Sequence, residues 1–493
     1  MPASPAGTAD AGPRRSPRTP EDPPNGWPTP DGRLISKEER ARRGRGARSA
    51  APRSSHAVWA PGPDRRDPVD ILTEQASTRV PELVPLRNAR MVASPFAFFR
   101  GSAAVMAADL ASTPSTGLPV QLCGDAHLSN FGGYASPDRS LVFDLNDFDE
   151  TLPGPWEWDV KRLVASVAIA GRSRGFSDAE RRAAVLATAA AYRSGMHEFA
   201  GAGNLQVWYS RVTVDDIRDR WASAAGKRAR RRFDKQIEKA MTKDSALASS
   251  RLTRRVDGRH EMISDPPLVV PVRELFGHED ASLVEATLRQ ALHGYRRTLT
   301  GARRHLIEQF HYVDAARKVV GVGSVGTRAW VALMVGNDNG EPLLLQVKEA
   351  DPSVLAPFAG RSRFDNQGQR VVMGQQLLQA SSDILLGWTR ITPPDGTGAH
   401  DFHIRQLWDW KISADVEKQS QSTMAIYGQL CGWTLARGHA RSGDRVAIAA
   451  YLGKGAAFDA AMADFAEAYA DQNELDHGRF AAAVNDGRVD AGA

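Results

Sequence analysis

Two short polar segments, GDAHLSNFG at residues 124–132 and FDLNDFDE at residues 143–150, most constrain what this chain can fold into. Residues 118–123 and 140–145 are apolar runs of the length and composition of buried strands. The first segment is therefore predicted as a loop between two strands, and the second as the end of the second strand. Polar loops at strand ends commonly carry chemistry, so we expect the functional centre at residues 124–149.

The residue types in these two segments suit phosphoryl transfer. That reaction needs a carboxylate to orient the attacking hydroxyl and oxygen ligands for magnesium beside the phosphates. Asp125, Asn130 and an acidic residue of the second segment can supply these groups. The Asp-x-His-x-x-Asn spacing places His127 in the same loop, where its ring can brace the backbone. We predict Asp125 and His127 as catalytic residues and Asn130 as a metal ligand.

The first segment resembles the HGDLHxxN catalytic loop of aminoglycoside phosphotransferases and choline kinases, and the second is similar to their metal-binding IDFDD strand end. This resemblance implies that Asp147 bridges the metal with Asp149 beside it, while Asp144 is the rival for that role. It also implies that Asp159, in PGPWEWDVKRL, buttresses the catalytic loop. The residue before the loop is Cys123 rather than His, so any contact made by that histidine is absent.

A glycine-rich stretch, VGVGSVG at residues 320–326, has glycines that let backbone amides approach a phosphate closely. The predicted strand at residues 327–335 follows it and ends at a GNDNG turn. A dinucleotide-binding fold would need a helix there, whereas strand, glycine loop, strand is the kinase arrangement. Lys348 then occupies the position of the phosphate-pairing lysine of kinases. We expect nucleotide contacts from Gly321, Gly323, Ser324, Gly326 and Lys348.

The order of these motifs is the reverse of that in kinases, because the glycine loop and the lysine follow the catalytic loop. Chain termini of compact domains often lie close together, so we infer a circular permutation. The fold class predicted is α+β, a protein kinase-like two-lobe fold with a small antiparallel sheet lobe and a larger helical lobe. The expected divisions are a disordered basic Pro/Arg-rich arm (1–66), a helical lobe with the catalytic and metal-binding loops (67–312), a nucleotide-binding lobe (313–412) and C-terminal helices completing the helical lobe (413–493).

Two details complete the comparison with kinases. Residues 402–410 resemble a hinge strand, and backbone groups at residues 406–408 are expected to meet the adenine. Kinases pair the strand lysine with a Glu on the next helix, yet residues 366–382 contain no Glu. Glu349 adjoins Lys348 but points to the opposite face of a strand, so the partner of the lysine is unassigned.

Hydrophobic periodicity and turn residues predict the remaining elements. Helices are expected at residues 95–110, 160–170, 178–199, 281–310, 369–380 and in a series over 416–469. Further strands are expected at residues 318–320, 342–348, 384–388 and 402–407.

Composition narrows the class of protein. The formal charge of +5 and the pI of about 9.2 come from residues 1–66, so the rest of the chain is near neutral and no specific nucleic-acid binding is predicted. No apolar run is long enough to span a membrane, and the N-terminus lacks the apolar region of a signal peptide. Cys123 and Cys431 form no disulfide or metal-binding spacing. We expect a cytoplasmic protein without membrane partners.

From about Val80 to Asp476 the chain resembles the bacterial family called domain of unknown function 2252. The phrases that carry the resemblance are SPFAFFRGSAAVMAADL, LCGDAHLSNFG, FDLNDFDE, PWEWDVKRL, VGVGSVGTR, LLLQVKEA and LARGHARSGD. The family name implies no reaction.

The leading hypothesis is an ATP- and Mg²⁺-dependent phosphotransferase whose partners are a nucleotide and an unidentified hydroxyl-bearing acceptor, a small molecule or a protein. Nucleotidyl transfer with the same residues stays open. One alternative is a metal-dependent phosphoesterase in which Asp125, His127, Asp144 and Asp147 bind one or two metals and activate water. Another is a catalytically inactive nucleotide-binding scaffold with a kinase-like fold.

Overall fold

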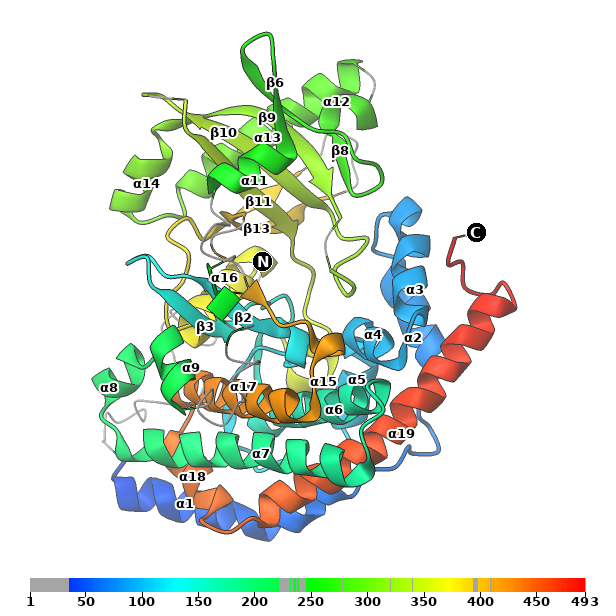
Figure 1. The fold of residues 1–493 in the computed structure, drawn as a ribbon, viewed down its shortest axis with the longest axis vertical. Helices are drawn as coiled ribbons and strands as arrows, with labels where there is room; N and C mark the ends of the chain where they lie inside the picture. Colours follow the sequence, from blue (N-terminus) through cyan, green and yellow to red (C-terminus); the bar gives the residue numbers. More distant parts are fainter. Residues whose placement is uncertain are drawn as a thin grey trace, which may run out of the picture.

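The computed structural model describes residues 35–220, 245–276, 278–319, 321–338, 340–392, 398–407 and 412–492, together with Trp410 and isolated positions within 221–244. Helices and small antiparallel sheets make up this part of the chain, as expected for an α+β protein. Figure 1 shows a lobe built around a sheet above a larger lobe built mostly of helices. We call these the sheet lobe and the helical lobe.

The sheet lobe contains a six-stranded sheet in the order β12-β13-β11-β10-β9-β8, in which every neighbouring pair is antiparallel. Its strands are β8 Val269–Pro271, β9 Phe310–Lys318, β10 Ala329–Gly336, β11 Pro342–Glu349, β12 Gly387–Ile391 and β13 His400–Gln406. Around it lie α11 Ser245–Leu252, the β6 Thr253–Val256 and β7 Arg259–Met262 hairpin, α12 Val272–Leu275, α13 His278–Arg296, α14 Gly301–Ile307 and α16 Gln367–Leu378. One apolar cluster joins α13 and α14 to the sheet, which fixes them in this lobe.

The helical lobe holds a four-stranded sheet in the order β14-β2-β3-β5 and a separate β1-β4 pair. Its strands are β1 Pro119–Leu122, β2 Phe131–Ala135, β3 Leu141–Leu145, β4 Leu152–Pro155, β5 Val212–Thr213 and β14 Ile412–Ser413. Its helices are α1 Lys37–Ala50, α2 Pro68–Ala76, α3 Val84–Val92, α4 Pro95–Gly101, α5 Ala103–Leu110, α6 Trp156–Ser173, α7 Asp178–Gly201, α8 Asn204–Tyr209, α9 Val214–Arg220, α15 Ala356–Ala359, α17 Gln421–Ser442, α18 Arg445–Leu452 and α19 Ala457–Asn485. Short 3₁₀ turns are η1 Arg53–Ala57, η2 Pro81–Leu83, η3 Leu128–Asn130 and η5 Val416–Lys418.

The core of the helical lobe forms where α7 and α17 pack closely together, with α6 and α19 against them. Glycines on α17 allow this approach, because a Cβ at Gly432 would lie 2.4 Å from the carbonyl oxygen of Thr188. The helix expected from residue 178 is confirmed, because α7 begins at Asp178 with Ser177 as its N-cap in a capping box with Glu180. The chain leaves this lobe for the sheet lobe and returns where Ile412 pairs with Gly133 of β2.

The prediction of a disordered arm over residues 1–66 is wrong for its second half; residues 1–34 lie outside the described residues. Residues 37–50 form α1, which begins at the N-cap Ser36. This helix has few apolar residues, and its arginines instead form polar contacts with α18 and its N-cap. Arg40 binds Asp444, and Arg48 donates to the carbonyl of Tyr451 at 2.9 Å. Composition alone does not reveal such partners.

Three other expectations need correction. The helix predicted at residues 281–310 is divided into α13 and α14, and Phe310 already belongs to β9. The boundary predicted at residue 312 is misplaced, because β8 pairs with β9 and α13 packs on the sheet. The strand predicted at residues 384–388 is β12, shifted to Gly387–Ile391. The basic run at residues 227–232 lies almost wholly outside the described residues.

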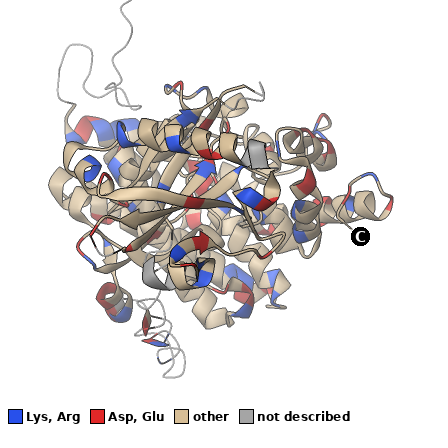
Figure 2. Cartoon of the chain, turned by 90° about the horizontal axis from the view of Figure 1, so that it is seen from above, with Lys and Arg blue, Asp and Glu red and all other residues tan. Residues whose placement is uncertain are grey.

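Acidic and basic residues are interspersed along the described chain in the view from above (Figure 2). Both cysteines are buried and free. No single helix in the described ranges combines the length and apolar composition needed to cross a membrane; the bent pair α18–α19 meets those criteria only when both helices are counted together.

Candidate active site

The loop after β1 is held by Asp159, the residue that the resemblance implies as a buttress. Asp159, buried on α6, accepts hydrogen bonds from the backbone N–H groups of Cys123 (2.8 Å) and Gly124 (3.0 Å). Gly124 has a φ of +86°, and a Cβ there would lie 2.3 Å from the carbonyl oxygen of Glu150, so only glycine fits. His439 of α17 lies 3.2 Å from Asp159 and 2.9 Å from the hydroxyl of Tyr192. This chain of contacts fixes the loop against two helices.

Asp125 is oriented by a buried arginine. Arg162 of α6 donates through Nε to Asp125 Oδ1 at 2.6 Å and through Nη2 to the carbonyl of Phe99 at 2.8 Å, and its guanidinium lies over the Phe99 ring. Charge-assisted bonds of this kind hold a carboxylate in one orientation. The Asp125 side chain keeps 19% of its surface exposed, so it remains accessible from solvent.

His127 is 3% exposed and contacts the backbone of its own loop. Burial lowers its pKa to about 4, against the opposing effect of Asp125, so the ring is neutral near pH 7. Its Nδ1 accepts the N–H of Ser129, which leaves the proton on Nε2, 3.6 Å from Asp125 Oδ2. The inward, bracing position expected for His127 is confirmed.

The three predicted metal ligands lie at one end of the same site. The Nδ2 of Asn130 donates to the carbonyl of Asp125 at 2.8 Å, which directs its other polar atom, the oxygen, away from that bond. Asp147, with a side chain 36% exposed, accepts the N–H of Asp149 at 3.3 Å. In the described part of the chain no group of three or more His, Cys, Asp or Glu residues is arranged to hold a metal by itself. Two carboxylates and an amide oxygen nevertheless fit magnesium, which takes few protein ligands when phosphates supply the others.

Lys348 meets these acids across the gap between the lobes. Its ammonium forms an ion pair and hydrogen bond with Asp149 and lies 3.9 Å from Asp147 Oδ1. Burial acts to lower the pKa of Lys348, but the two carboxylates outweigh it and raise the pKa, so the side chain is charged. Segments 199 residues apart in sequence therefore form one site, and the partner of Lys348 is Asp149 rather than a helix Glu.

The glycine loop covers the same point. Ser324 Oγ donates to Asp149 Oδ2 at 3.3 Å. Gly321 and Gly326 have φ values of +69° and +91°, which a side chain would strain. The loop is docked on the helical lobe: Val80 N–H donates to the Gly326 carbonyl at 2.8 Å, and Arg90 donates to the Gly321 carbonyl at 2.5 Å. The residue before Gly321 lies outside the described residues.

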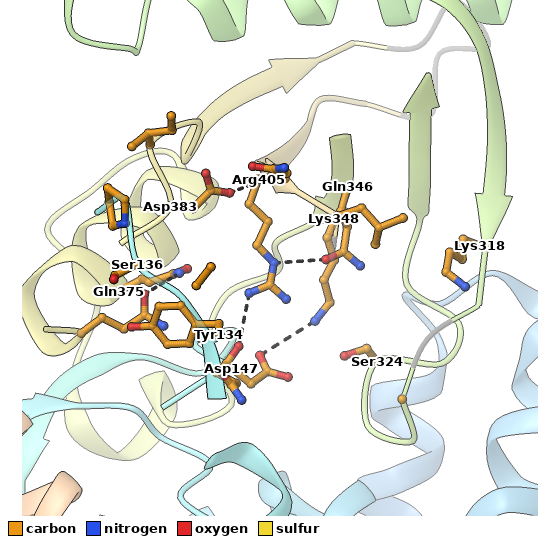
Figure 3. Close-up of a pocket in the computed structure, with 18 of the residues that line it drawn as sticks. Tyr134, Ser136, Asp147, Lys318, Ser324, Gln346, Lys348, Gln375, Asp383 and Arg405 are labelled. Carbon is orange, nitrogen blue, oxygen red and sulfur yellow. Dashed lines mark hydrogen bonds and ion pairs between the residues drawn. The ribbon is translucent and has the colours of Figure 1, made fainter. Parts of the chain in front are cut away.

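Two cavities flank this loop and share Asp147, Gly321 and Ser324. The sheet-side cavity, of about 310 Å³, is also lined by Lys318, Gln346, Lys348, Gln375, Asp383 and Arg405 (Figure 3). The helix-side cavity, of about 270 Å³, is also lined by Arg79, Arg100, Asp125, Asn130, Asp149 and Asp351. The predicted catalytic residues Asp125 and His127 line only the helix-side cavity, whereas Lys348 lines only the sheet-side cavity. Of the predicted nucleotide-binding residues in the loop, Gly323 lines the helix-side cavity, and Gly321 and Ser324 line both.

Two expectations about neighbouring residues are resolved by their hydrogen bonds. Asp144 is fully buried and accepts from Arg437 at 2.6 and 2.8 Å and from the N–H of Ala380 at 2.8 Å, so it does not line either cavity. Asp147 is therefore better placed than Asp144 as a metal ligand. Glu349 binds Arg328 and His400 on the other side of β11, as its strand position indicates.

The contact expected between adenine and the backbone groups of residues 406–408 stays a prediction, but the N–H groups of residues 406 and 407 do not point to it. The N–H of Gln406 donates to Asp383 at 2.5 Å, and the N–H of Leu407 donates to the carbonyl of Leu344 at 2.8 Å. Both donors are therefore engaged within the protein. Residue 408 lies outside the described residues.

The fold and the site define an α+β protein with a polar cleft between a sheet lobe and a helical lobe. The chain belongs to the family described as "Uncharacterized protein conserved in bacteria (DUF2252)", whose model matches residues 79–483. Neither a curated protein nor a solved structure matches it significantly.

Proposed function

We propose that this protein is an ATP- and Mg²⁺-dependent phosphotransferase that acts on a hydroxyl-bearing acceptor, with a circularly permuted, kinase-like arrangement of its two lobes. The observation that carries the proposal is the meeting of Lys348 with Asp149 and Asp147 beneath the glycine loop. A cation, backbone amides and carboxylates at one point are the groups that phosphoryl transfer requires.

The path of the sheet supports the kinase-like part of the proposal. The glycine loop joins the adjacent antiparallel strands β9 and β10, the lysine lies on the next strand, β11, and α16 follows. Kinases place the same parts in this order. Because β14 pairs with β2, the chain returns to the catalytic strands after the sheet lobe, as a permuted order requires.

Each residue has a role that follows from its position. Asp125, oriented by Arg162, accepts the proton of the acceptor hydroxyl in the helix-side cavity. Asn130, Asp147 and Asp149 would hold Mg²⁺, which neutralises phosphate charge when bound. Lys348 and the amides of residues 321–326 bind phosphate oxygens, and His127 keeps the loop in place.

The phosphoesterase alternative loses one of its ligands. It needs Asp125, His127, Asp144 and Asp147 around one or two metals, but Asp144 is buried on Arg437. It also gives no role to the glycine loop or to Lys348. The positions of these residues therefore favour transfer over hydrolysis.

Binding and turnover of ATP test the proposal. The wild-type protein should be stabilised against thermal unfolding by Mg·ATP, and Lys348→Met should weaken that binding at least about tenfold, since one phosphate-binding cation is lost. Asp125→Asn should keep binding but lose turnover, measured as ADP release with a panel of small hydroxylated acceptors and peptides. The exposed Lys454→Met and Asp178→Asn serve as matched controls.

Two results would contradict the proposal. If Lys348→Met binds Mg·ATP as tightly as the wild type, the lysine does not meet phosphate. If ATP binds equally to the wild type and to Asp125→Asn and neither turns over with any acceptor, the inactive scaffold describes the protein better.

A further inference from the structure

Arg405 is placed across the sheet-side cavity rather than along its wall. The residue lies on β13 opposite Gln346 of β11. Its Nε donates to Gln346 Oε1 at 3.1 Å, and its Nη1 donates to the carbonyl of Asn146 in the helical lobe at 3.2 Å. Figure 3 shows the guanidinium extending into the cavity beside Lys348, above Asp147 and Tyr134. Arg405 therefore bridges the two lobes at the inner end of the cavity.

The charge of Arg405 is not matched by a carboxylate. Both of its acceptors, an amide side chain and a backbone carbonyl, are neutral, and in the described ranges it forms no ion pair. The acids that line this cavity are engaged elsewhere: Asp147 lies 3.9 Å from Lys348, and Asp383 accepts the N–H groups of Leu385 and Gln406. Arginine stays protonated in proteins, so a half-buried positive charge is left with neutral partners. Such a charge is costly unless an anion meets it.

The surroundings of Arg405 suit phosphate better than a nucleobase. A base pocket usually presents apolar or aromatic faces with few polar groups. The groups that Arg405 contacts here are polar, namely Gln346 and the Asn146 carbonyl, and Lys348, Gln375 and Gln379 line the same cavity together with Tyr134, Ile384 and Leu407. The amides of residues 406 and 407, which could have read a base edge, are already bonded.

We infer that Arg405 and Lys348 form a paired binding site for the polyphosphate of a nucleotide at the inner end of the sheet-side cavity, with Gln346 holding Arg405 in position. This inference rests on the proposed function and deepens it. The fork of an arginine can bind two phosphate oxygens at once, while the ammonium of Lys348 binds as a point charge. The base of the nucleotide then lies away from this wall.

Calorimetric titration of the full chain in the presence of Mg²⁺ tests the site with three probes: inorganic tripolyphosphate, ATP and adenosine. Arg405→Gln keeps side-chain donors near Gln346 and the Asn146 carbonyl but removes the charge. It should weaken tripolyphosphate and ATP by a similar factor, about tenfold or more, and leave adenosine unchanged. Arg405→Lys should restore part of the loss. Arg254→Gln, an exposed arginine of the β6–β7 hairpin, is the matched control.

The results that would overturn the inference are distinct. Tripolyphosphate affinity that is unchanged in both Arg405→Gln and Arg405→Lys removes the site. A loss of adenosine affinity as large as that of ATP places the base, not phosphate, on Arg405. A thermal unfolding midpoint close to that of the wild type verifies that each variant is folded. If Arg405→Gln does not fold, Arg405→Lys is titrated with the same three probes. Because lysine lacks the two-pronged guanidinium, this variant should bind tripolyphosphate more weakly than the wild type but bind adenosine equally well.

The test also separates this inference from the proposed function. If tripolyphosphate binds through Arg405 but ATP is never turned over, the anion site stands and the phosphotransferase proposal fails. If ATP is turned over and Arg405→Gln binds all three probes like the wild type, the phosphotransferase stands and the anion site fails.

Discussion

Arg162 shows how one buried side chain can set the geometry of the proposed chemistry. It is 2% exposed, and its guanidinium donates hydrogen bonds to Asp125 and to the carbonyl of Phe99. A carboxylate that is free to rotate would present the wrong oxygen to an acceptor hydroxyl for much of the time. Arg162 is thus a positioning residue, because it acts through Asp125.

Replacing Arg162 by Met should lower kcat by about a hundredfold, since a small misplacement of a catalytic group costs that much. The KM for ATP should change little, because Arg162 does not line the sheet-side cavity. Arg162→Lys should recover part of kcat by restoring one charge-assisted bond. Arg182→Met, at a half-exposed ion pair with Asp464, is the control in steady-state kinetics. Equal losses in kcat and in ATP affinity would speak for general unfolding instead.

The single residues that carry the proposed chemistry could be predicted from the sequence, but the residues that position them could not. Asp125, Asp147 and Lys348 stand in motifs, and the structure brings all three to the glycine loop. Arg162 flanks an apolar run and looks like a residue at the edge of a buried helix face. The signal that could have revealed it is its spacing on α6, one turn after Asp159. The partner of Lys348 depends on a fold contact that no local pattern encodes.

The glycine loop is an element whose docking sets its mobility. Val325 is 1% exposed and packs with Leu83 and Val319, while Val322 contacts a second apolar cluster that includes Met91. Arg79 also donates to the Val325 carbonyl at 2.5 Å. The N-terminal helices of the helical lobe thus hold the loop down over the site.

Val325→Asp should release the loop, because a carboxylate cannot stay in that apolar contact without a partner. We expect hydrogen exchange at the amides of residues 321–327 to speed up by at least about tenfold, with the strands β9 and β10 still protected. Val58→Asp, at a residue 75% exposed, is the control. Unchanged exchange in the loop would mean that its docking does not depend on this apolar contact.

Elements with strong periodicity were predictable, and those stabilised by distant partners were not. The cap and extent of α7 follow from Ser177 and helical spacing. By contrast, α1 has little apolar surface, and what places it is a close approach at Gly44 and bonds from Arg48 to α18. The prediction from composition was wrong there because the apolar content of a segment indicates how much surface it can bury. It does not indicate whether the arginines of the segment bind carbonyl groups elsewhere in the chain.

Across the whole molecule, the sequence predicted two kinds of lobe but misplaced the border between them. The strands β10 and β11 follow from clear patterns, whereas β9 was expected only at residues 318–320, and β8 is only three residues long and gives no periodicity. Its pairing with β9 brings α12 and α13 into the sheet lobe. A short edge strand of this kind becomes visible only once its partner is placed.

One ion-pair cluster ties the N-terminal segment to the rest of the helical lobe, and it offers a test on overall stability. Arg65 is 10% exposed and binds Asp109 of α5 at 2.7 Å and Asp476 of α19 at 2.6 Å. Despite the opposing effect of burial, these carboxylates raise the pKa of Arg65. The next residue, Arg66, is 58% exposed and binds Glu74, which is 69% exposed.

Arg65→Met should therefore destabilise the protein by about 3 kcal/mol or more, because it leaves two buried carboxylates without their cation. Arg66→Met should change the stability by less than about 1 kcal/mol, since an exposed pair contributes little. Denaturant unfolding at pH 7 measures the free energy of unfolding of each variant, so the two neighbouring arginines can be compared directly. Burial raises the pKa of Asp109, so on lowering the pH the difference should shrink, because a protonated Asp109 no longer needs a counter-ion. Equal stability of the two variants at pH 7 would show that the segment before α2 is held by its apolar contacts instead.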